Sequence, residues 1–344
     1  MYRWNNDYNQ SAHPKILQAL EKINSQNFPG YGKDELCQKA ADKIKEVIGN
    51  DNADVHFLVG GTQVNFIVIA ASLKSFQSVI SVNTGHINRH ETGAVENIGK
   101  KIEALEGVDA KISAKQIEKV AKHFEESGIK EHITQPKMVY ISFPTEYGTV
   151  YSKEELTNIR KVCDKYGLYL MVDGARLGYG IAAKNGDVSI KDIAKFADVF
   201  YIGGTKCGAL FGEAVVILND DLKPDFRSYI KQNGGMLAKG WLLGLQFCAL
   251  FHDNLYFDIT KKAVDYAMKI KDAFIKKGIP LFIDSPTNQQ FYVLNHSQIA
   301  KLEINHILDH DHKIDEEYDC IRICTGWHTT EESVNALIND INLL

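Results

Sequence analysis

Two stretches decide the fold of this chain: Val172-Asp173-Gly174-Ala175-Arg176-Leu177 and Gly203-Gly204-Thr205-Lys206-Cys207-Gly208. Each follows a short apolar run, Leu168 to Val172 before the first and Val199 to Ile202 before the second, as a loop after a buried strand does. Ligands of α/β proteins bind outside the carboxyl ends of the strands. The two stretches therefore predict an acid and a lysine at the ligand-binding edge of one sheet.

The rest of the N-terminal two thirds alternates between strand-like and helical patterns. Further β-branched runs predict strands at Val55–Val59, Ser78–Val82, Met138–Ser142 and Ala214–Leu218. Apolar residues at helical spacing predict helices at Glu35–Ile48, Ala114–Glu126 and Lys153–Tyr166. This alternation is typical of an α/β fold with a mostly parallel sheet.

The pattern changes after Gly240. Leu242–Phe251 is apolar nearly all round, as a helix buried between domains is, and an amphipathic helix is expected over Thr260–Lys277. Strand-like runs follow at Phe291–Leu294 and Ile321–Cys324, then a last helix from Thr330 to Leu343, with Thr329 and Glu332 as its capping box. We therefore expect an N-terminal arm over residues 1–32, a large domain over 33–240, and an interdomain helix with a small C-terminal α+β domain over 241–344. The arm is expected to join the small domain or to cross to a second subunit.

The composition is that of an ordinary globular protein. Of the 344 residues, 44% are hydrophobic and 24% are charged, and the formal net charge is −5. This charge gives no reason to expect binding to nucleic acid, and no apolar run reaches the length of a membrane span. The N-terminus lacks the apolar core of a signal peptide, and the six cysteines include no CxxC pair. We expect a cytoplasmic protein with reduced thiols.

Lys206 and Asp173 together indicate pyridoxal 5'-phosphate as a cofactor. It needs a lysine for its Schiff base and a carboxylate that keeps its pyridine nitrogen protonated, so that the ring acts as an electron sink. Gly203 and Gly204 let a ligand approach the backbone closely, and Thr205 offers a hydroxyl to a phosphate. Each residue alone has an ordinary alternative, because a lysine in a glycine turn is often structural and an aspartate at a strand end often caps a helix.

Three further features lie at predicted strand ends. Gly60-Gly61-Thr62-Gln63-Val64-Asn65 follows one strand and opens a helix, where backbone N–H groups and the helix dipole favour a phosphate. His86 begins the loop after Ser78–Val82, where its ring can stack on a pyridine face and move protons. Arg176 is a fixed cation that suits a phosphate or a carboxylate. A glycine turn and a lone histidine also occur commonly in purely structural roles.

In order and over nearly the whole chain, these motifs resemble the fold type I pyridoxal-phosphate enzymes, and among them the threonine aldolase / β-eliminating lyase family. The residues that carry the resemblance are Tyr31-Gly32, Gly60-Gly61-Thr62, His86 with Glu91-Thr92-Gly93-Ala94, Asp173-Gly174-Ala175-Arg176-Leu177, Thr205-Lys206, and Arg322 with Thr325. The resemblance implies the PLP-dependent transferase-like α/β fold.

The resemblance also implies roles for individual residues. Lys206 would be the Schiff-base lysine, Asp173 the pyridine partner and His86 the stacking ring. The phosphate and cofactor would be bound by Gly61, Thr62, Thr205 and Arg176, and the substrate by Asn6, Arg176, Arg322 and Tyr31. Asn6 stands where the family usually has a serine. Glu91 would assist His86 as catalytic base, with His90 as the rival base.

The implied reaction is reversible cleavage of a β-hydroxy-α-amino acid, of the L-threonine or L-allo-threonine type, to glycine and an aldehyde through an external aldimine. Three alternatives remain open: β-elimination, transamination, and a binding protein without activity on the same fold. The expected ligand is a small amino acid. A homodimer or homotetramer is expected, with Tyr31 reaching across the subunit interface.

Three departures from the family pattern, of which Asn6 is the first, leave the substrate's side chain and stereochemistry open. Tyr31-Gly32-Lys33-Asp34-Glu35 lacks the family's proline, and Cys207 stands where a small or polar residue is usual. Apart from these departures, one segment is rich in histidine and contains His306, His310 and His312. Its spacing is no recognised catalytic zinc pattern, so we expect a solvated loop and no metal.

Overall fold

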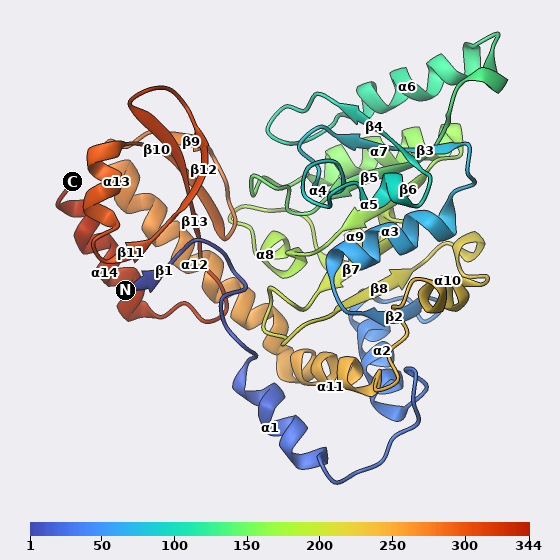
Figure 1. The fold of residues 1–344 in the computed structure, drawn as a ribbon, viewed down its shortest axis with the longest axis horizontal. Coiled ribbons are helices and arrows are strands. Elements are labelled where there is room, and N and C mark those ends of the chain that lie inside the picture. The colour runs from blue at the N-terminus through green and yellow to red at the C-terminus, as the bar shows by residue number, and fades with distance from the viewer.

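The computed structural model describes residues 1–344, which form two lobes connected by a long helix (Figure 1). The larger lobe is built on a seven-stranded sheet with the order β2-β8-β7-β6-β5-β3-β4. Its strands are β2 (Asp54–Leu58), β3 (Gln77–Val82), β4 (Lys101–Leu105), β5 (Gln135–Ser142), β6 (Tyr169–Asp173), β7 (Val199–Gly203) and β8 (Glu213–Ile217). Only β8 runs against its neighbours. The predicted α/β fold with a mostly parallel sheet is confirmed.

Helices cover both faces of this sheet, because successive strand residues point to opposite sides. Val139, Leu170 and Phe200 face one layer, which contains α2 (Glu35–Ile48), α6 (Ala114–Glu126), α7 (Lys153–Tyr166) and α9 (Ile190–Phe196). Met138 and Met171 face the other layer, which contains α3 (Gly61–Ser72), α5 (Ala94–Asn97) and α10 (Phe226–Gln232). The remaining helices of this part of the chain are α1 (Pro14–Ile23), α4 (His86–Arg89), α8 (Leu177–Ile181) and α11 (Trp241–Leu250).

The smaller lobe contains a four-stranded antiparallel sheet with the order β12-β13-β10-β9. Its strands are β9 (Leu281–Ile283), β10 (Gln289–Asn295), β12 (Asp309–Lys313) and β13 (Tyr318–Cys324). One face packs on α12 (Leu255–Lys276) and α14 (Glu331–Asn342), and Ile321 and Ile323 of β13 lie in that core. The helix α13 (His296–Leu302) completes the lobe. No helix of the structure is both long enough and apolar enough to cross a bilayer.

The N-terminus belongs to the smaller lobe (Figure 1). The short strand β1 (Tyr2–Arg3) pairs in parallel with β11 (His306–Ile307), and the Trp4 side chain is buried in the core of this lobe. The arm then crosses to the larger lobe, where α1 packs beside α11. The division of the chain at residues 32 and 240 stays a prediction.

Two expectations for local structure are wrong, and one strand of the large sheet was missed. The edge strand β4 was not expected, because its residues are only half-buried or exposed and carry a weak apolar pattern. The segment around His306 to His312 is not a loop, because it forms β11 and β12 by pairing with β1 and β13. The capping box of α14 is made by Thr330 and Ser333, one residue later than expected for its cap.

Candidate active site

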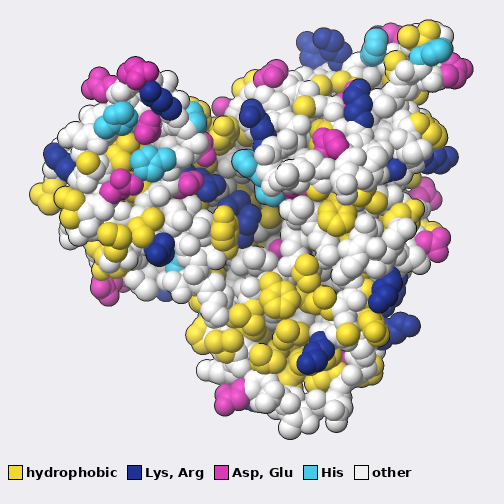
Figure 2. All heavy atoms as spheres, viewed as in Figure 1, with side chains coloured by type: hydrophobic (Ala, Val, Ile, Leu, Met, Phe, Trp, Pro, Cys, Tyr) yellow, Lys and Arg dark blue, Asp and Glu magenta, His cyan; other side chains and the backbone are white.

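Parallel strands bring the predicted site residues to one edge of the large sheet. Asp173 is the last residue of β6, and Lys206 follows the end of β7 by three residues. His86 begins α4 after β3, and Gly61 begins α3 after β2. All four strands run in the same direction, so their carboxyl ends share an edge. Figure 2 shows Lys, Arg and His side chains gathered in the hollow between the two lobes.

Asp173 is buried within a set of hydrogen bonds that hold its carboxylate. Its side chain points toward the α3 side of the sheet, since it lies two residues after Met171. Tyr140 and Tyr201 donate their hydroxyls to it, the latter at 2.5 Å, and the backbone N–H of Ala175 donates to Oδ1 at 3.0 Å. Burial raises the pKa of Asp173, but the nearby His86 and these donors outweigh it, so the pKa lies below its ordinary value. The carboxylate therefore stays ionised.

Gly174 allows the chain after β6 to lie close to β7. A side chain at position 174 would place its Cβ 1.9 Å from the carbonyl oxygen of Tyr201. The backbone N–H of Gly203 also donates to the Gly174 carbonyl at 2.9 Å. The Asp-Gly-Ala-Arg element is thus tied to β7, which brings Asp173 and the turn that holds Lys206 together.

Asn65 connects Asp173 with Glu91. Its side-chain amide donates to Glu91 Oε1 at 2.7 Å and to Asp173 Oδ2 at 3.2 Å, and the residue is fully buried. His86 Nδ1 lies 2.8 Å from the same Glu91 oxygen. Glu91 Oε2 and Asn65 Oδ1 are buried and have no hydrogen-bond partner. The site therefore contains acceptor atoms that the protein itself leaves unused.

His86 is held at both its backbone and its ring. Glu146 Oε1 accepts a hydrogen bond from the His86 backbone N–H at 2.9 Å, while Glu91 holds Nδ1. Burial lowers the pKa of His86, but the hydrogen bond to Glu91 and the charge of Asp173 raise it more. The net pKa lies above its ordinary value. The ring of His90, the rival base, lies 5.6 Å from the His86 ring, centroid to centroid.

Lys206 lies near a buried acid, Glu213, at the start of β8. Burial and the charge of Arg176 lower the pKa of Lys206, which favours the neutral, nucleophilic amine. Burial also disfavours the charged form of Glu213, which raises the pKa of this carboxyl group. Thr205 donates its hydroxyl to Glu213 Oε1 at 2.7 Å and accepts the backbone N–H of Gly212 at 3.0 Å. In this structure, the two hydrogen bonds of the Thr205 hydroxyl therefore stabilise the turn that contains Lys206.

The glycine turn before α3 has the properties of an anion site. No side chain caps the N-terminus of α3, so its first N–H groups are left without a side-chain acceptor. Gly61 lies close to the Tyr201 hydroxyl, and a Cβ there would come within 3.0 Å of that oxygen. Gly61 and Thr62 are half-buried. A free helix N-terminus beside a lysine, an ionised aspartate and a histidine fits a phosphorylated aromatic aldehyde such as pyridoxal 5'-phosphate.

The two arginines differ in what they contact. Arg176 makes a two-point ion pair with Asp7, at 2.7 Å from Nε and 2.9 Å from Nη2. Arg322 lies 2.8 Å from Asp309, donates to Gln289 at 3.2 Å, and leaves its buried Nε without a partner. Both guanidinium groups are largely buried, with side-chain exposures of 13% for Arg176 and 21% for Arg322. Arg176 is therefore held by Asp7, whereas Arg322 keeps one buried N–H group without a partner.

The N-terminal segment also reaches the site. Asn6 Oδ1 accepts the backbone N–H of Tyr8 at 3.0 Å, which shapes a turn next to Asp7. The Lys206 amine lies 5.9 Å from the centre of the exposed Tyr8 ring. The turn places Asn6 next to the Asp7–Arg176 pair.

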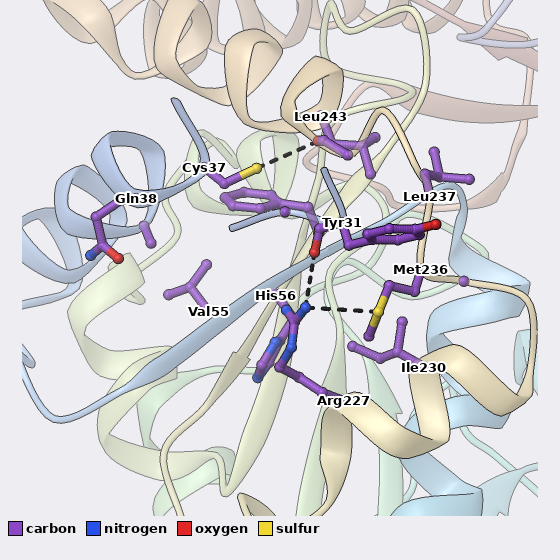
Figure 3. Close-up of a pocket in the computed structure, with 15 residues that line it drawn as sticks. Tyr31, Cys37, Gln38, Val55, His56, Arg227, Ile230, Met236, Leu237 and Leu243 are labelled. Carbon is purple, nitrogen blue, oxygen red and sulfur yellow. Dashed lines mark hydrogen bonds between the residues drawn. The ribbon is translucent and has the colours of Figure 1, made fainter. Parts of the chain in front are cut away.

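Tyr31 is not brought to Lys206 within one chain. It lines a separate pocket between α2, α10 and α11, together with Arg227, Met236 and His56 (Figure 3). Arg227 donates to the Tyr31 carbonyl at 2.9 Å, and the Tyr31 side chain is 47% exposed. A role of Tyr31 in the site of a neighbouring subunit stays a prediction.

Several residues of the site were assigned no role from the sequence. They are Asp7, Asn65, Tyr140, Glu146, Tyr201 and Glu213. The sequence did offer a signal for Glu213, which precedes the apolar run Ala214 to Ile217. Burying an acid at the start of such a strand is costly unless it has a partner, which indicates a functional or structural role. Tyr140 and Tyr201 likewise place a hydroxyl inside buried strands.

The fold matches that of known proteins. A mutant aspartate aminotransferase of Thermus thermophilus superimposes with a TM-score of 0.71 at 13% identity, over 100% of this chain and 92% of that chain. This similarity defines an α/β fold of type I, like that of aspartate aminotransferase, as the resemblance implied. Residues 13–332 match the beta-eliminating lyase family, and the chain belongs to that family.

Individual members are similar over nearly their whole length. The structure of a Leishmania major threonine aldolase superimposes with a TM-score of 0.97 at 40% identity, over 100% of this chain and 99% of that one. A low specificity L-threonine aldolase of Pseudomonas aeruginosa is 28% identical over 339 residues, which are 96% of this chain and 94% of the relative. A second one, from a Pseudomonas species, is 31% identical over 71% of this chain and 69% of its own length.

Proposed function

We propose that this protein is a pyridoxal-phosphate-dependent threonine aldolase, which cleaves a β-hydroxy-α-amino acid to glycine and an aldehyde. The observation that carries the proposal is the arrangement at one sheet edge of the Lys206 amine, the ionised Asp173 and the Glu91–His86 pair. The threonine aldolases named above support the same reaction, because the chain matches them over most of its length.

The cofactor would be held by residues that the structure leaves available. Lys206 would bind its aldehyde carbon, the N-terminus of α3 at Gly61 and Thr62 its phosphate, and Asp173 its ring nitrogen. When bound, pyridoxal phosphate supplies the electron sink for the bond that breaks. The two tyrosines that donate to Asp173 keep this carboxylate in place and ionised.

The substrate would be held through its carboxylate. Arg322 has a buried Nε without a partner, and Arg176 is oriented by Asp7 close by. A carboxylate between two guanidinium groups gains charge-assisted hydrogen bonds, and holding it fixes the orientation of the Cα–Cβ bond. Asn6, in the turn beside Asp7, would add a further hydrogen bond.

His86 would accept the proton of the substrate's β-hydroxyl. Its Nδ1 is held by Glu91, so Nε2 is the nitrogen left to face a substrate. Glu91 favours the charged form of the ring after it takes up the proton. The anchored ring is therefore preferred to His90, which is the rival base.

The reaction is tested by incubating the purified protein and cofactor separately with L-threonine, L-allo-threonine, phenylserine and serine. Glycine with acetaldehyde or benzaldehyde is the expected result. Pyruvate with ammonia would instead assign β-elimination, and a keto acid formed without loss of carbon would assign transamination. Absence of turnover with all four amino acids, despite a bound cofactor, would leave a binding protein.

The cofactor site is tested independently of turnover. Borohydride reduction of the protein with its cofactor, followed by peptide mapping, should label the peptide that contains Lys206. Lys206→Ala should lose the visible absorbance of the cofactor, whereas Lys223→Ala should keep it, since Lys223 is bonded to Asp220 and the Asn52 carbonyl on the surface. A label on any other lysine would overturn the assignment.

The assembly is expected to be a homodimer or homotetramer with a shared site. Tyr31 is exposed in one chain and lies away from Lys206, so a role in catalysis would require a second chain. Tyr31→Phe should reduce kcat without changing the sedimentation coefficient. A fully active monomer in sedimentation would exclude the shared site and leave the cofactor chemistry unaffected.

A further inference from the structure

Asp311, His312 and Cys320 offer three metal-ligand atoms at one place in the smaller lobe. A carboxylate oxygen, an imidazole nitrogen and the Cys320 sulfur all lie within 4.8 Å of one another. His312 and Cys320 are directly paired between β12 and β13. The histidine-rich segment was not expected to bind metal, and the cysteine that completes this group comes from a different strand.

A β-bulge assembles the three side chains. His310 pairs with Ile321 and His312 with Cys320, so Asp311 is an extra residue on β12. In a regular strand, Asp311 and His312 would point to opposite faces. The bulge turns them toward the same side, where Asp311 Oδ2 lies 2.8 Å from His312 Nδ1.

The other two histidines of the segment have different roles. His306 is buried, accepts a hydrogen bond from the Trp4 ring nitrogen at 3.1 Å and lies 2.8 Å from Asp340. His310 contacts Glu303 at 2.9 Å. The second ring nitrogen of His310, Nδ1, lies 3.5 Å from Asp319, so both ring nitrogens of each histidine have a partner. Of the three histidines, only His312 belongs to the group that contains the Cys320 thiol.

The surroundings suit a bound cation. The Cys320 side chain is fully buried, and its thiol makes no hydrogen bond, whereas those of Cys37 and Cys248 donate to carbonyls. The His312 ring packs edge-on against Phe282 at 4.8 Å, which holds it on one side. Asp311 and His312 retain side-chain exposures of 24% and 37%, so both can adjust and water can reach the site. Figure 2 shows histidine and acidic side chains together on the smaller lobe.

We propose that Asp311, His312 and Cys320 form a binding site for zinc or a similar divalent transition metal. Sulfur, nitrogen and oxygen ligands in one site match zinc, which takes three protein ligands and a water in a tetrahedral site. Ligands of one zinc ion lie roughly 3–4 Å apart, so a small contraction of the group is enough. As the sulfur–metal bond forms, the thiol proton passes to solvent.

The site lies close to Arg322. Cys320 and Arg322 are two residues apart on β13 and therefore point to the same face of the sheet, opposite the core that contains Ile321 and Ile323. A metal ion that links β12 to β13 would also restrain Asp309, which pairs with Arg322 in both the backbone ladder and the ion pair. The metal site itself does not depend on the proposed reaction.

The test is a titration of the chelator-treated full chain, with its cofactor, by Zn²⁺ in a calorimeter. One Zn²⁺ per chain is expected at this site, and crystals soaked in Zn²⁺ should show zinc-edge anomalous density between the three side chains. His312→Ala and Asp311→Asn, which change half-exposed or exposed side chains, should each weaken binding more than about tenfold. His310→Ala, on the same strand, should bind as the wild type does.

Cys320→Ser tests the sulfur ligand, and circular dichroism establishes whether that variant is folded. Unchanged affinity in His312→Ala and Asp311→Asn, or anomalous density only elsewhere at saturating Zn²⁺, would overturn the proposal. If the aldolase reaction failed while zinc bound here, only the proposed function would be lost.

Discussion

Asp7 and Arg176, 169 positions apart in the chain, form a buried two-point ion pair. The side chain of Asp7 is fully buried and that of Arg176 is 13% exposed. Asn288 donates a further hydrogen bond to Asp7 at 2.9 Å. The pair ties the N-terminal segment to the loop after β6 and holds Arg176 in one orientation. Three separate parts of the chain therefore depend on one carboxylate.

Asp7→Asn should lower the free energy of unfolding by about 3–5 kcal/mol, because it leaves the Arg176 charge buried and unpaired. Urea denaturation measures the effect. Lys261→Ala is the control, since it removes a pair with Asp265 that is exposed on both sides, and it should have a much smaller effect. Equal effects of the two variants would contradict this account.

The same pair predicts a loss of stability in acid. Burial raises the pKa of Asp7, but the charges of Arg176 and Lys206 outweigh it, so the pKa falls to about 2. A carboxylate whose pKa is lowered by folding stabilises the folded protein at pH values above its unfolded pKa. This stabilisation is lost as the pH falls through the folded pKa. About 2 kcal/mol should therefore disappear between about pH 4 and pH 2. The stability difference between wild type and Asp7→Asn should shrink over this range, and a constant difference would refute the assignment.

Asp173→Asn should reduce kcat by roughly 10³-fold while some cofactor remains bound, because a neutral amide no longer stabilises a protonated ring nitrogen; this assumes a loss of about 4 kcal/mol. Tyr201→Phe is the matched control, since it removes one donor and keeps the carboxylate. Steady-state kinetics with cofactor absorbance separates turnover from binding. An unchanged kcat in Asp173→Asn would mean that Asp173 only caps the following turn through Ala175.

Glu91→Gln should lower the pKa of His86. Burial lowers this pKa, and the raised value depends on the hydrogen bond and charge of Glu91. The pKa read from NMR titration of the His86 ring, or from the pH dependence of kcat/KM, should shift downward. Glu96→Gln, an exposed residue of α5, should leave it in place. If the pKa of His86 is the same in both variants, Glu91 does not act through His86.

Arg322→Ala should raise KM by roughly 10- to 150-fold, since a charge-assisted hydrogen bond to the substrate carboxylate contributes about 1.5–3 kcal/mol. Arg322→Lys keeps the charge and should lose less. Kinetics with the best amino acid from the substrate panel gives KM and kcat separately. Unaltered KM in Arg322→Ala would leave Arg176 as the residue that binds the carboxylate.

The sequence by itself determined the strands of the large sheet other than β4, and the positions of Asp173 and Lys206 after two of them. Strand and helix periodicities are local, and α2 and α7 begin and end at the predicted residues. Residues that follow parallel strands must meet at one edge, so an acid after β6 and a lysine after β7 could be placed without coordinates. The Asp-Gly-Ala-Arg element was visible in the sequence, but the reason for its glycine is a tertiary contact, because a Cβ at position 174 would lie 1.9 Å from the Tyr201 carbonyl oxygen on β7.

Only the tertiary structure decided which side chains share a partner. Asn65 bridges Glu91 and Asp173, and Arg176 meets Asp7, across separations of 26 to 169 positions. Such contacts depend on how whole strands and lobes pack, which no local pattern encodes. The register of β12 on β13 is a second example, since a bulge of one residue changes the face to which a side chain points. His312 and Cys320 therefore become neighbours only when the two strands pair.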